Sequence, residues 1–402
     1  MANPPMTETY DAVIVGARCA GAPLAQRLAE GGWKVAMVDR DPPPADTLST
    51  HLFFPNTLQR LSELGILERL EAEHTLHHLL YRVRILDAEF VGTFTPIGGF
   101  DRACIVTRPV LDAALLDAAV DAGAEKVLGR KVTGLVGEGT ADDPVRGVVL
   151  EDGESIGARW VLGADGRAST VASLLGLEKE RPMAGGMGML FGYFTGMPDS
   201  DEISLDAHED LVMTGGRCED DVHMVTLNGP PDITRGSQEE RRSWMLDAMT
   251  KFPDTLDPDA AREAELVSEV RVAPETMLRG FFRQATGPGW ALIGDAGHFK
   301  HPSTAQGISD AIEQALHVAD GLLNGEDLSG YGQWRDERAV EHYEWSFDFA
   351  QLPRPEVAGP LFRGIAADPE AAQDLRDTNT RLVRPRSGAM TKERLQRWFS
   401  AG

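Results

Sequence analysis

This sequence has few cysteines, no long apolar run and no signal of a targeting segment. Its three cysteines, Cys19, Cys104 and Cys218, are scattered over 402 residues, and their spacing supports neither a disulfide framework nor a zinc site. We therefore expect no bound metal and a reducing compartment, the cytoplasm. No stretch approaches the ~20 apolar residues that span a bilayer. The first residues also lack the basic and apolar regions of a signal peptide.

Positive charge is scarce as well. The chain has 39 Lys and Arg against 63 Asp and Glu, which gives a net charge of −24. Such a surface repels nucleic-acid phosphates and anionic lipids, so we expect neither nucleic acid nor a membrane as a partner. A hydrophobic content of 42% is that of an ordinary globular protein. One stretch, 376–397, is locally basic, and we interpret it as a solvated helix face or as a contact with the acidic body.

The sequence does have glycine-marked turns after short apolar runs. Residues 10–15 read as a buried strand, and Gly16, Arg18 and Gly21 follow with Gly-x-Gly-x-x-Gly spacing, although Arg18 stands where the middle glycine belongs. A helix and a second strand ending at Asp39 complete a βαβ unit, which predicts a dinucleotide-binding turn. An acidic residue at that strand end binds a ribose hydroxyl and disfavours a 2′-phosphate. The Arg18 side chain could lie over the phosphates or point away.

A second turn, far along the chain, points to the other end of the same cofactor. The apolar run 290–293 leads into Gly294 and Asp295, and Pro302 precedes a predicted helix over 306–323. Asp295 can bind a ribityl hydroxyl, and the helix N-terminus can face the pyrimidine end of a flavin, where the reduced form is negative. Together the two turns predict one FAD that spans the fold.

A third strand-and-turn motif covers 163–171, with Asp165 and Gly166 at its centre. By itself it fits a plain turn with an aspartate cap. In this order and spacing, the three motifs resemble those of the FAD-dependent monooxygenases of the aromatic-hydroxylase superfamily, which includes para-hydroxybenzoate hydroxylase. The resemblance covers roughly residues 10–340. Ser309 stands in place of the usual asparagine, which is typical of a less characterised branch.

The resemblance implies an α/β fold with three parts. A Rossmann-like FAD-binding domain would comprise residues 1–80, 101–180 and 281–340. An inserted antiparallel β-sheet would form the substrate domain from 81–100 and 181–280, where short β-like runs alternate with Gly, Pro and Asp. A helical C-terminal segment would follow over 341–402.

The motifs and the resemblance together assign cofactor contacts from the adenosine end to the flavin end. Cys19, at the start of a helix, is either a packed small residue or a thiol of lowered pKa. The predicted cofactor-binding residues are Gly16, Arg18, Cys19, Ala20, Gly21, Asp39, Arg40, Arg108, Asp165, Gly166, Gly294, Asp295, Pro302, Gln306, Gly307 and Ile308. No second Rossmann unit is visible in the sequence, so NAD(P)H would deliver electrons directly or through a separate flavin reductase.

The resemblance further implies that the enzyme oxygenates an apolar, aromatic or polycyclic small molecule with molecular oxygen, through a flavin C4a-hydroperoxide. Hydroxylation, epoxidation and Baeyer–Villiger insertion all stay open, as do a monomer and a homodimer. A geranylgeranyl-type reductase, a halogenase and a flavin redox sensor share the fold. A halogenase would need a lysine early in the chain and a Trp-x-Trp-x-Ile-Pro motif, but this sequence has no lysine between Lys34 and Lys126 and no such motif. A sensor would need an output module, and none is evident in the sequence.

Aromatic and methionine residues predict the substrate pocket, and two histidines are candidate acid–base groups. The pocket would be built by 181–230 and 49–54, with ordinary core packing as the alternative role for each side chain. His51 and His301, if their pKa values lie near neutrality, could move a proton to or from substrate, or could be structural. The predicted substrate contacts are Phe53, Phe54, Phe191, Tyr193, Met213 and Met224.

Overall fold

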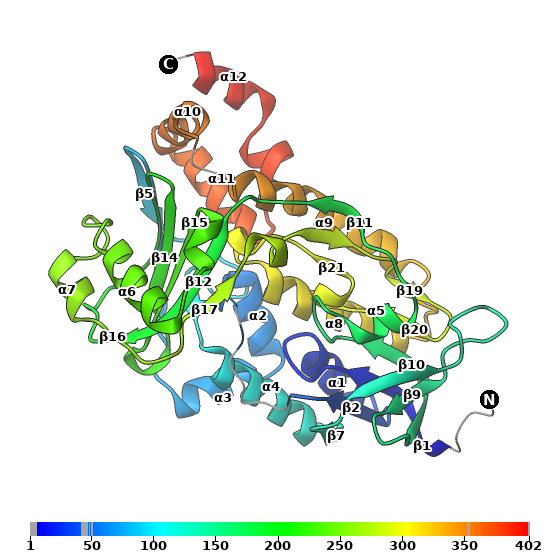
Figure 1. The fold of residues 1–402 in the computed structure, drawn as a ribbon. Coiled ribbons are helices and arrows are strands. Elements are labelled where there is room, and N and C mark those ends of the chain that lie inside the picture. Colours follow the sequence, from blue (N-terminus) through cyan, green and yellow to red (C-terminus); the bar gives the residue numbers. More distant parts are fainter. Residues whose placement is uncertain (1–5, 42–46, 48, 50, 352–353, 401–402) are drawn as a thin grey trace.

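Two large sheets with helices around them make up the computed structural model, which describes residues 6–41, 47, 49, 51–351 and 354–400 (Figure 1). The outermost residues of the predicted first and last domains, 1–5 and 401–402, lie outside the described residues. Within the described ranges, no helix combines the length and the apolar character needed to cross a membrane.

The first sheet contains the predicted βαβ unit. Five strands run parallel in the order β20–β10–β1–β2–β7, and β19, β9 and β8 extend the sheet with antiparallel pairings. The strands β1, β2, β10 and β20 contain apolar runs because both faces of the sheet are covered there. Their bounds are β1 (Met6–Val15), β2 (Val35–Asp39), β7 (Glu125–Leu128), β8 (Val132–Val136), β9 (Gly147–Leu150), β10 (Ser155–Gly163), β19 (Thr286–Gly287) and β20 (Trp290–Leu292).

Strand alternation sends the side chains of β1 into two separate cores. Ile14 packs with α1 (Gly21–Glu30), α4 (Arg108–Asp121) and α8 (Gly307–Leu323), whose apolar faces meet on one side of the sheet. Val13 and Val15 pack on the other side with β8, β9 and α5 (Thr170–Leu174). The end of β1 is thereby held rigidly between two layers.

One predicted helix is two helices in the structure. The periodicity over 55–70 predicts a single helix, but α2 (Pro55–Glu63) ends before Gly65, and α3 (Ile66–Glu73) begins after it. Gly65 has φ 67°, a left-handed conformation that glycine adopts at little cost and that breaks the helical hydrogen-bond ladder. The leucine spacing continues across the break because the leucines of both helices are buried in the same hydrophobic core.

The second sheet follows the order β16–β12–β15–β14–β13–β4–β5, with β17 also paired to β12. Its pairings are antiparallel except that of β13 with β4, which is parallel. The strands are β4 (Leu80–Ile85), β5 (Ala88–Gly92), β12 (Gly188–Thr195), β13 (Glu202–His208), β14 (Leu211–Arg217), β15 (His223–Gly229), β16 (Glu265–Leu266) and β17 (Arg271–Ala273). Helices α6 (Gln238–Met249) and α7 (Pro258–Glu263) cover its outer face (Figure 1).

Helices dominate the last part of the chain: α9 (Tyr331–Phe349), α10 (Pro355–Ala366), α11 (Pro369–Asn379) and α12 (Lys392–Ser400). The predicted domain boundary at 340 falls inside α9, and the domain division itself stays a prediction. The basic stretch contacts the acidic body, as Arg386 pairs with Glu344 of α9 at 2.6 Å. There are also two small sheets, β11–β18–β21 and β3–β6. Their strands are β3 (Leu52–Phe53), β6 (Cys104–Ile105), β11 (Glu180–Met183), β18 (Gly280–Phe282) and β21 (His298–Phe299).

Candidate functional site

A cleft of about 600 Å³ lies at the carboxyl ends of the parallel strands. Val15, Asp39 and Ile293 line it where β1, β2 and β20 end, and Ala164 lines it just after β10. This is the edge at which open α/β sheets bind their ligands, because the loops there diverge and helix N-termini point toward it. The volume is within the ~300–1,000 Å³ range of small-molecule and cofactor sites.

At the β1 end of the cleft, close backbone packing explains the glycines. Gly16 has φ 103°, and a Cβ there would lie 2.4 Å from the carbonyl oxygen of Ala164. A Cβ on Gly21 would lie 1.8 Å from the oxygen of Gly16, so the strand and α1 approach each other through both glycines. The N-cap residue of α1 is Ala20, whose side chain makes no capping hydrogen bond. This helix start can therefore receive an anion such as a pyrophosphate.

Asp39 organises the same end of the cleft. Its carboxylate accepts hydrogen bonds from the backbone N–H of Ala17 at 2.8 Å and of Asp41 at 2.9 Å. Arg18 lines the cleft and donates to the backbone oxygen of Asp41 at 3.3 Å, and Arg40 pairs with the Asp41 carboxylate. The arginine that replaces the middle glycine thus lies along the wall and leaves the turn open.

Asp165 has an unused acceptor beside the cleft. Its Oδ2 accepts from the backbone N–H of Thr170 at 2.6 Å, which fits a helix cap. Its Oδ1 is buried, has no hydrogen-bond partner among the described residues, and belongs to a side chain that lines the cleft. Burial raises the pKa of this carboxyl. A ligand hydroxyl in the cleft would satisfy the unused oxygen, so the site fits a polar cofactor.

At the other end, Asp295 and the start of α8 face the cleft. Asp295 is half-buried, and burial together with the charge of Asp310 raises its pKa to about 6. Gly307 opens the 17-residue helix α8, and a Cβ there would meet no atom within 4 Å. The side chain of Gln306, the N-cap residue, makes no capping hydrogen bond to α8. An open helix N-terminus beside a desolvated carboxyl suits a cofactor end that carries hydroxyls and develops negative charge.

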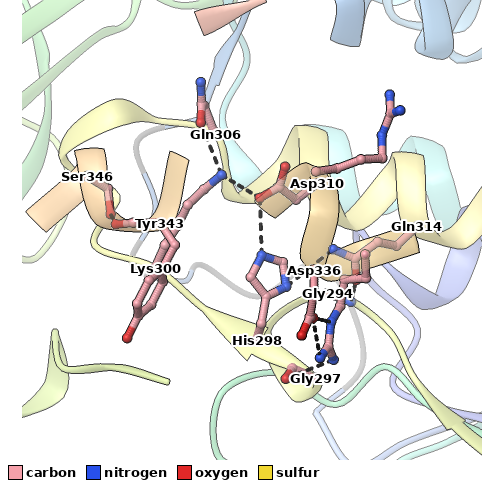
Figure 2. A network of polar contacts seen from close by, with 12 residues as sticks. Gly294, Gly297, His298, Lys300, Gln306, Asp310, Gln314, Asp336, Tyr343 and Ser346 are labelled. Carbon is pink, nitrogen blue, oxygen red and sulfur yellow. Dashed lines mark hydrogen bonds and ion pairs between the residues drawn. The ribbon is translucent and has the colours of Figure 1, made fainter. Parts of the chain in front are cut away.

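Behind this end lies a buried polar network that the sequence did not reveal. Figure 2 shows Lys300 between Gln306 and Asp310, with His298 on the far side of Asp310. Lys300 Nζ donates to Gln306 Oε1 at 3.1 Å and pairs with Asp310, whose other oxygen pairs with Arg381. Burial raises the pKa of Asp310, but Arg381 and Lys300 outweigh it and hold that pKa well below its usual range.

Gln314 extends the network to the Gly294 turn. Its Oε1 accepts from the backbone N–H of Gly294 at 2.9 Å and from the hydroxyl of Tyr331 at 3.0 Å, and its Nε2 lies 3.3 Å from His298 Nδ1. The turn is thus held by α8 and α9 together. Lys300 also lines the cleft, and its place beside His301 in the second motif was the only sequence signal for it.

A second buried polar group lies between the cleft and the second sheet. Arg108 donates to the two carboxylate oxygens of Asp112, one turn along α4, at 3.0 and 2.9 Å. Cys19 donates from Sγ to Asp112 at 3.3 Å, and burial raises its pKa, so the alternative of a lowered thiol pKa was wrong. Tyr193 shares a 2.5 Å hydrogen bond with His51 Nε2.

A smaller cavity of about 40 Å³ adjoins the cleft beneath the second sheet. The two share four wall residues, which are Met189, His301, Pro302 and Ala305. Most of the remaining wall is apolar, and it includes Leu52, Phe54, Tyr81, Leu205, Val212 and Phe349. We call it the apolar pocket.

Of the six predicted substrate residues, one lines a cavity and the other five are buried in core clusters. Phe54 lines the apolar pocket. Phe53, Phe191, Tyr193 and Met224 are buried in core clusters and line neither cavity. Met213 lies on the opposite face of the sheet, in the core beneath α6, because strand alternation turns it away. The pocket instead uses Met187 and Met189, which the prediction left out.

The cofactor assignments concentrate on the cleft. Gly21, Gly294 and Gln306 lie behind its wall and shape it, while the rest of the predicted set lines it: Gly16, Arg18, Cys19, Ala20, Asp39, Arg40, Arg108, Asp165, Gly166, Asp295, Pro302, Gly307 and Ile308. Arg167, which belongs to the third motif, lines it as well, and so does Thr47, which no motif marks.

Neither candidate histidine has a pKa near neutrality. Burial and the charge of Arg108 lower the pKa of His51 well below its ordinary value. Burial alone lowers the pKa of His301 to about 4. Both rings are therefore neutral at pH 7, which corrects the expectation of a histidine poised to exchange protons. In the part of the chain that the structure describes, no group of three or more His, Cys, Asp or Glu is arranged to hold a metal.

Comparison with known proteins supports the cofactor. A family model described as an FAD binding domain matches residues 9–333. The chain is 28% identical over 369 residues to a menaquinone reductase from Mycolicibacterium smegmatis, covering 89% of this chain and 88% of the relative. It is 26% identical over 325 residues to a 6-methylpretetramide 4-monooxygenase from Streptomyces rimosus, covering 78% and 75%.

A solved structure has the same fold. A flavoprotein/dehydrogenase from Cytophaga hutchinsonii superposes with a TM-score of 0.78 at 17% sequence identity, and the match covers 98% of each chain. At that identity the likeness concerns the fold alone. It agrees with the α/β architecture that the three motifs predict.

Proposed function

We propose that this protein oxygenates an apolar, aromatic or polycyclic small molecule. The chain belongs to the FAD binding domain family and is an FAD-dependent oxidoreductase. NAD(P)H would supply electrons directly or through a flavin reductase. Molecular oxygen would be the second substrate. The location is the cytoplasm, and the protein acts as a monomer or a homodimer.

FAD would lie along the cleft. The Gly16 turn and the start of α1 would receive its pyrophosphate, and Asp39 would bind the adenosine ribose. Asp165 Oδ1 and Asp295 would accept from hydroxyls nearer the flavin, whose pyrimidine end would face Gly307. When bound, FAD supplies hydride acceptance and, once reduced, activation of oxygen.

The observation that carries the proposal is the apolar pocket beside the flavin end of the cleft. Its wall is mostly apolar and shares Met189 and His301 with the cleft, so a substrate there would lie against the flavin with water excluded. Arg108, buried with Asp112, would hold positive charge next to the cofactor. The Streptomyces relative is named a monooxygenase, which supports this class of reaction.

A second candidate function is the reduction of an alkene, as in geranylgeranyl-type reductases. Relatives named menaquinone reductase favour it, with 28% identity over nearly the whole chain in one case. The same cleft and pocket would serve both reactions, since they differ in whether the reduced cofactor reacts with oxygen or with the substrate.

Isotope labelling separates the two candidates. The FAD-loaded protein is reduced and mixed with ¹⁸O₂ and a panel of hydroxylated polycyclic aromatics, and in parallel with menaquinone without oxygen. We expect an aromatic product that carries ¹⁸O. A menaquinone that gains two hydrogens at a side-chain double bond under anaerobic conditions, measured after the ring has been reoxidised to the quinone, with no labelled product from any aromatic, would replace the oxygenase by the reductase. Asp295→Ala should weaken FAD retention, and unchanged flavin content would refute the placement of the flavin end.

A further inference from the structure

Three buried polar groups without partners line the apolar pocket. They are His301 Nε2, Thr304 Oγ1 and Asn228 Oδ1, and none has a hydrogen-bond partner among the described residues. All three side chains are more than nine-tenths buried. A buried polar group without a hydrogen-bond partner destabilises the folded protein, so three of them around one small cavity call for an occupant.

His301 presents a hydrogen-bond donor to this pocket. Its Nδ1 accepts from the backbone N–H of Ser303 at 3.2 Å, so the neutral ring carries its proton on Nε2. Burial lowers the pKa of His301 to about 4, which keeps the ring neutral. Phe347 packs edge-on against it with ring centroids 5.6 Å apart and fixes its orientation. The unpartnered Nε2–H can therefore donate but not accept.

Asn228 and Thr304 come from other elements and have complementary capacities. Asn228 stands on β15, paired with Met189 and Val212 of the neighbouring strands, and its free Oδ1 is an acceptor. Thr304 belongs to the short turn before α8, and its hydroxyl can donate or accept. The pocket thus offers a fixed donor, an acceptor and an adaptable hydroxyl within apolar walls.

We propose that these three groups recognise the oxygen atoms of the substrate, which is an aromatic ketone or quinone bearing a ring hydroxyl. The carbonyl would accept from His301 Nε2–H, and the hydroxyl would donate to Asn228 Oδ1, with Thr304 completing either bond. The proposal rests on the proposed function for placing the substrate beside FAD, and it deepens that function by naming the substrate class.

The size of the pocket sets a condition on this binding. At about 40 Å³ it has room for little more than a water, whose share of liquid volume is ~30 Å³. Met187 and Met189 form part of the wall, and methionine side chains rearrange easily to admit a ring. A single bound water is the competing occupant, since it could satisfy the same three groups.

Ligand titration of the oxidised, FAD-loaded protein tests the proposal. The probes are 5-hydroxy-1,4-naphthoquinone and 1-methylnaphthalene, followed by the change in flavin absorbance. Thr304→Val and Asn228→Leu remove polar atoms with little change in volume. We expect each to weaken binding of the hydroxyquinone about tenfold, the effect of one lost partner to a buried polar group. Each should leave binding of methylnaphthalene unchanged or tighter.

Thr226→Val is the matched control. Thr226 lines the same pocket, but its hydroxyl already donates to the backbone oxygen of Thr214 at 3.4 Å, so its loss should change the ratio of the two affinities less than threefold. Two substitutions on different elements keep the test usable if one variant fails to fold.

Other outcomes overturn the proposal. Equal weakening of both probes, or no change in either, would mean that the groups hold water or serve packing. A loss of FAD retention with an unchanged ratio would mean that they serve the cofactor. Because binding requires no turnover, retained discrimination with no ¹⁸O incorporation would remove the oxygenase assignment and leave the recognition site standing.

Discussion

At the β1 end of the cleft, the lining residues hold one another through short-range backbone contacts, whereas at the α8 end they are held by side chains from distant segments. Asp39 accepts from the backbone of Ala17 and Asp41, within one βαβ unit. Asp310 pairs with Lys300 on one side and with Arg381, 71 positions away, on the other. The first end is solvent-accessible at Asp41, whereas Lys300 and Asp310 at the second end are buried.

The β1 end is therefore formed by residues close together in sequence, whereas the α8 end depends on contacts between distant segments. The β1 end needs glycines that allow close approach and one carboxylate at a strand end. The α8 end needs the C-terminal helices to be in place, because Arg381 and the backbone of Thr378, which accepts from Gln306, lie beyond α11 and at its end. We therefore expect substitutions at the α8 end to lower the free energy of unfolding more than substitutions at the β1 end.

Removal of the Asp310 carboxylate should have the largest effect. Asp310→Ala leaves Lys300 and Arg381 buried without a counter-charge, so we expect a loss of about 3–5 kcal/mol in the free energy of unfolding. Urea unfolding of the purified protein measures it. On the same helix, Glu313→Gln breaks only the more exposed pair with Arg338 and should cost no more than about 1 kcal/mol. Equal losses in the two variants would contradict the comparison.

A fall in pH should have the second-largest effect on the free energy of unfolding, through His301 at the α8 end. Unfolded histidine titrates near pH ~6.5, and in the folded protein burial lowers the pKa of His301 to about 4. Between these values the unfolded chain binds more protons, so stability falls as the pH falls, by about 3 kcal/mol in total. His301→Gln removes this contribution. Its unfolding free energy should vary less with pH between 6.5 and 4 than that of the unchanged protein, and identical slopes would refute the shift.

Disruption of the β1 end should have the smallest effect on stability. Asp39→Ala deprives the Ala17 and Asp41 amides of their acceptor, and we expect a loss of about 1–2 kcal/mol together with weaker FAD retention. Thermal unfolding and flavin release into ultrafiltrate measure the two. Asp41→Ala, which removes an exposed carboxylate beside Arg40, is the control and should stay within about 0.5 kcal/mol. A loss larger than that of Asp310→Ala would reverse the comparison.

Local patterns carried much of the fold and of the cofactor cleft. The βαβ unit, the aspartate at the end of β2 and the turn before α8 are marked by residues close together in sequence, and most predicted cofactor residues line the cleft. The substrate residues were harder. Aromatic and methionine side chains in a strand are equally suited to a core and to a pocket, so composition could not separate Phe54 from Phe191 or Met213 from Met189.

The sequence by itself determined the family, the cofactor and the edge of the sheet at which the cleft lies, because glycine and aspartate act there through backbone geometry over a few residues. Only the tertiary structure decided which face of the second sheet borders the pocket, how Asp310, Lys300 and Arg381 meet, and that His301 is neutral with a free donor. Those properties depend on burial and on contacts between distant segments, which no local pattern encodes.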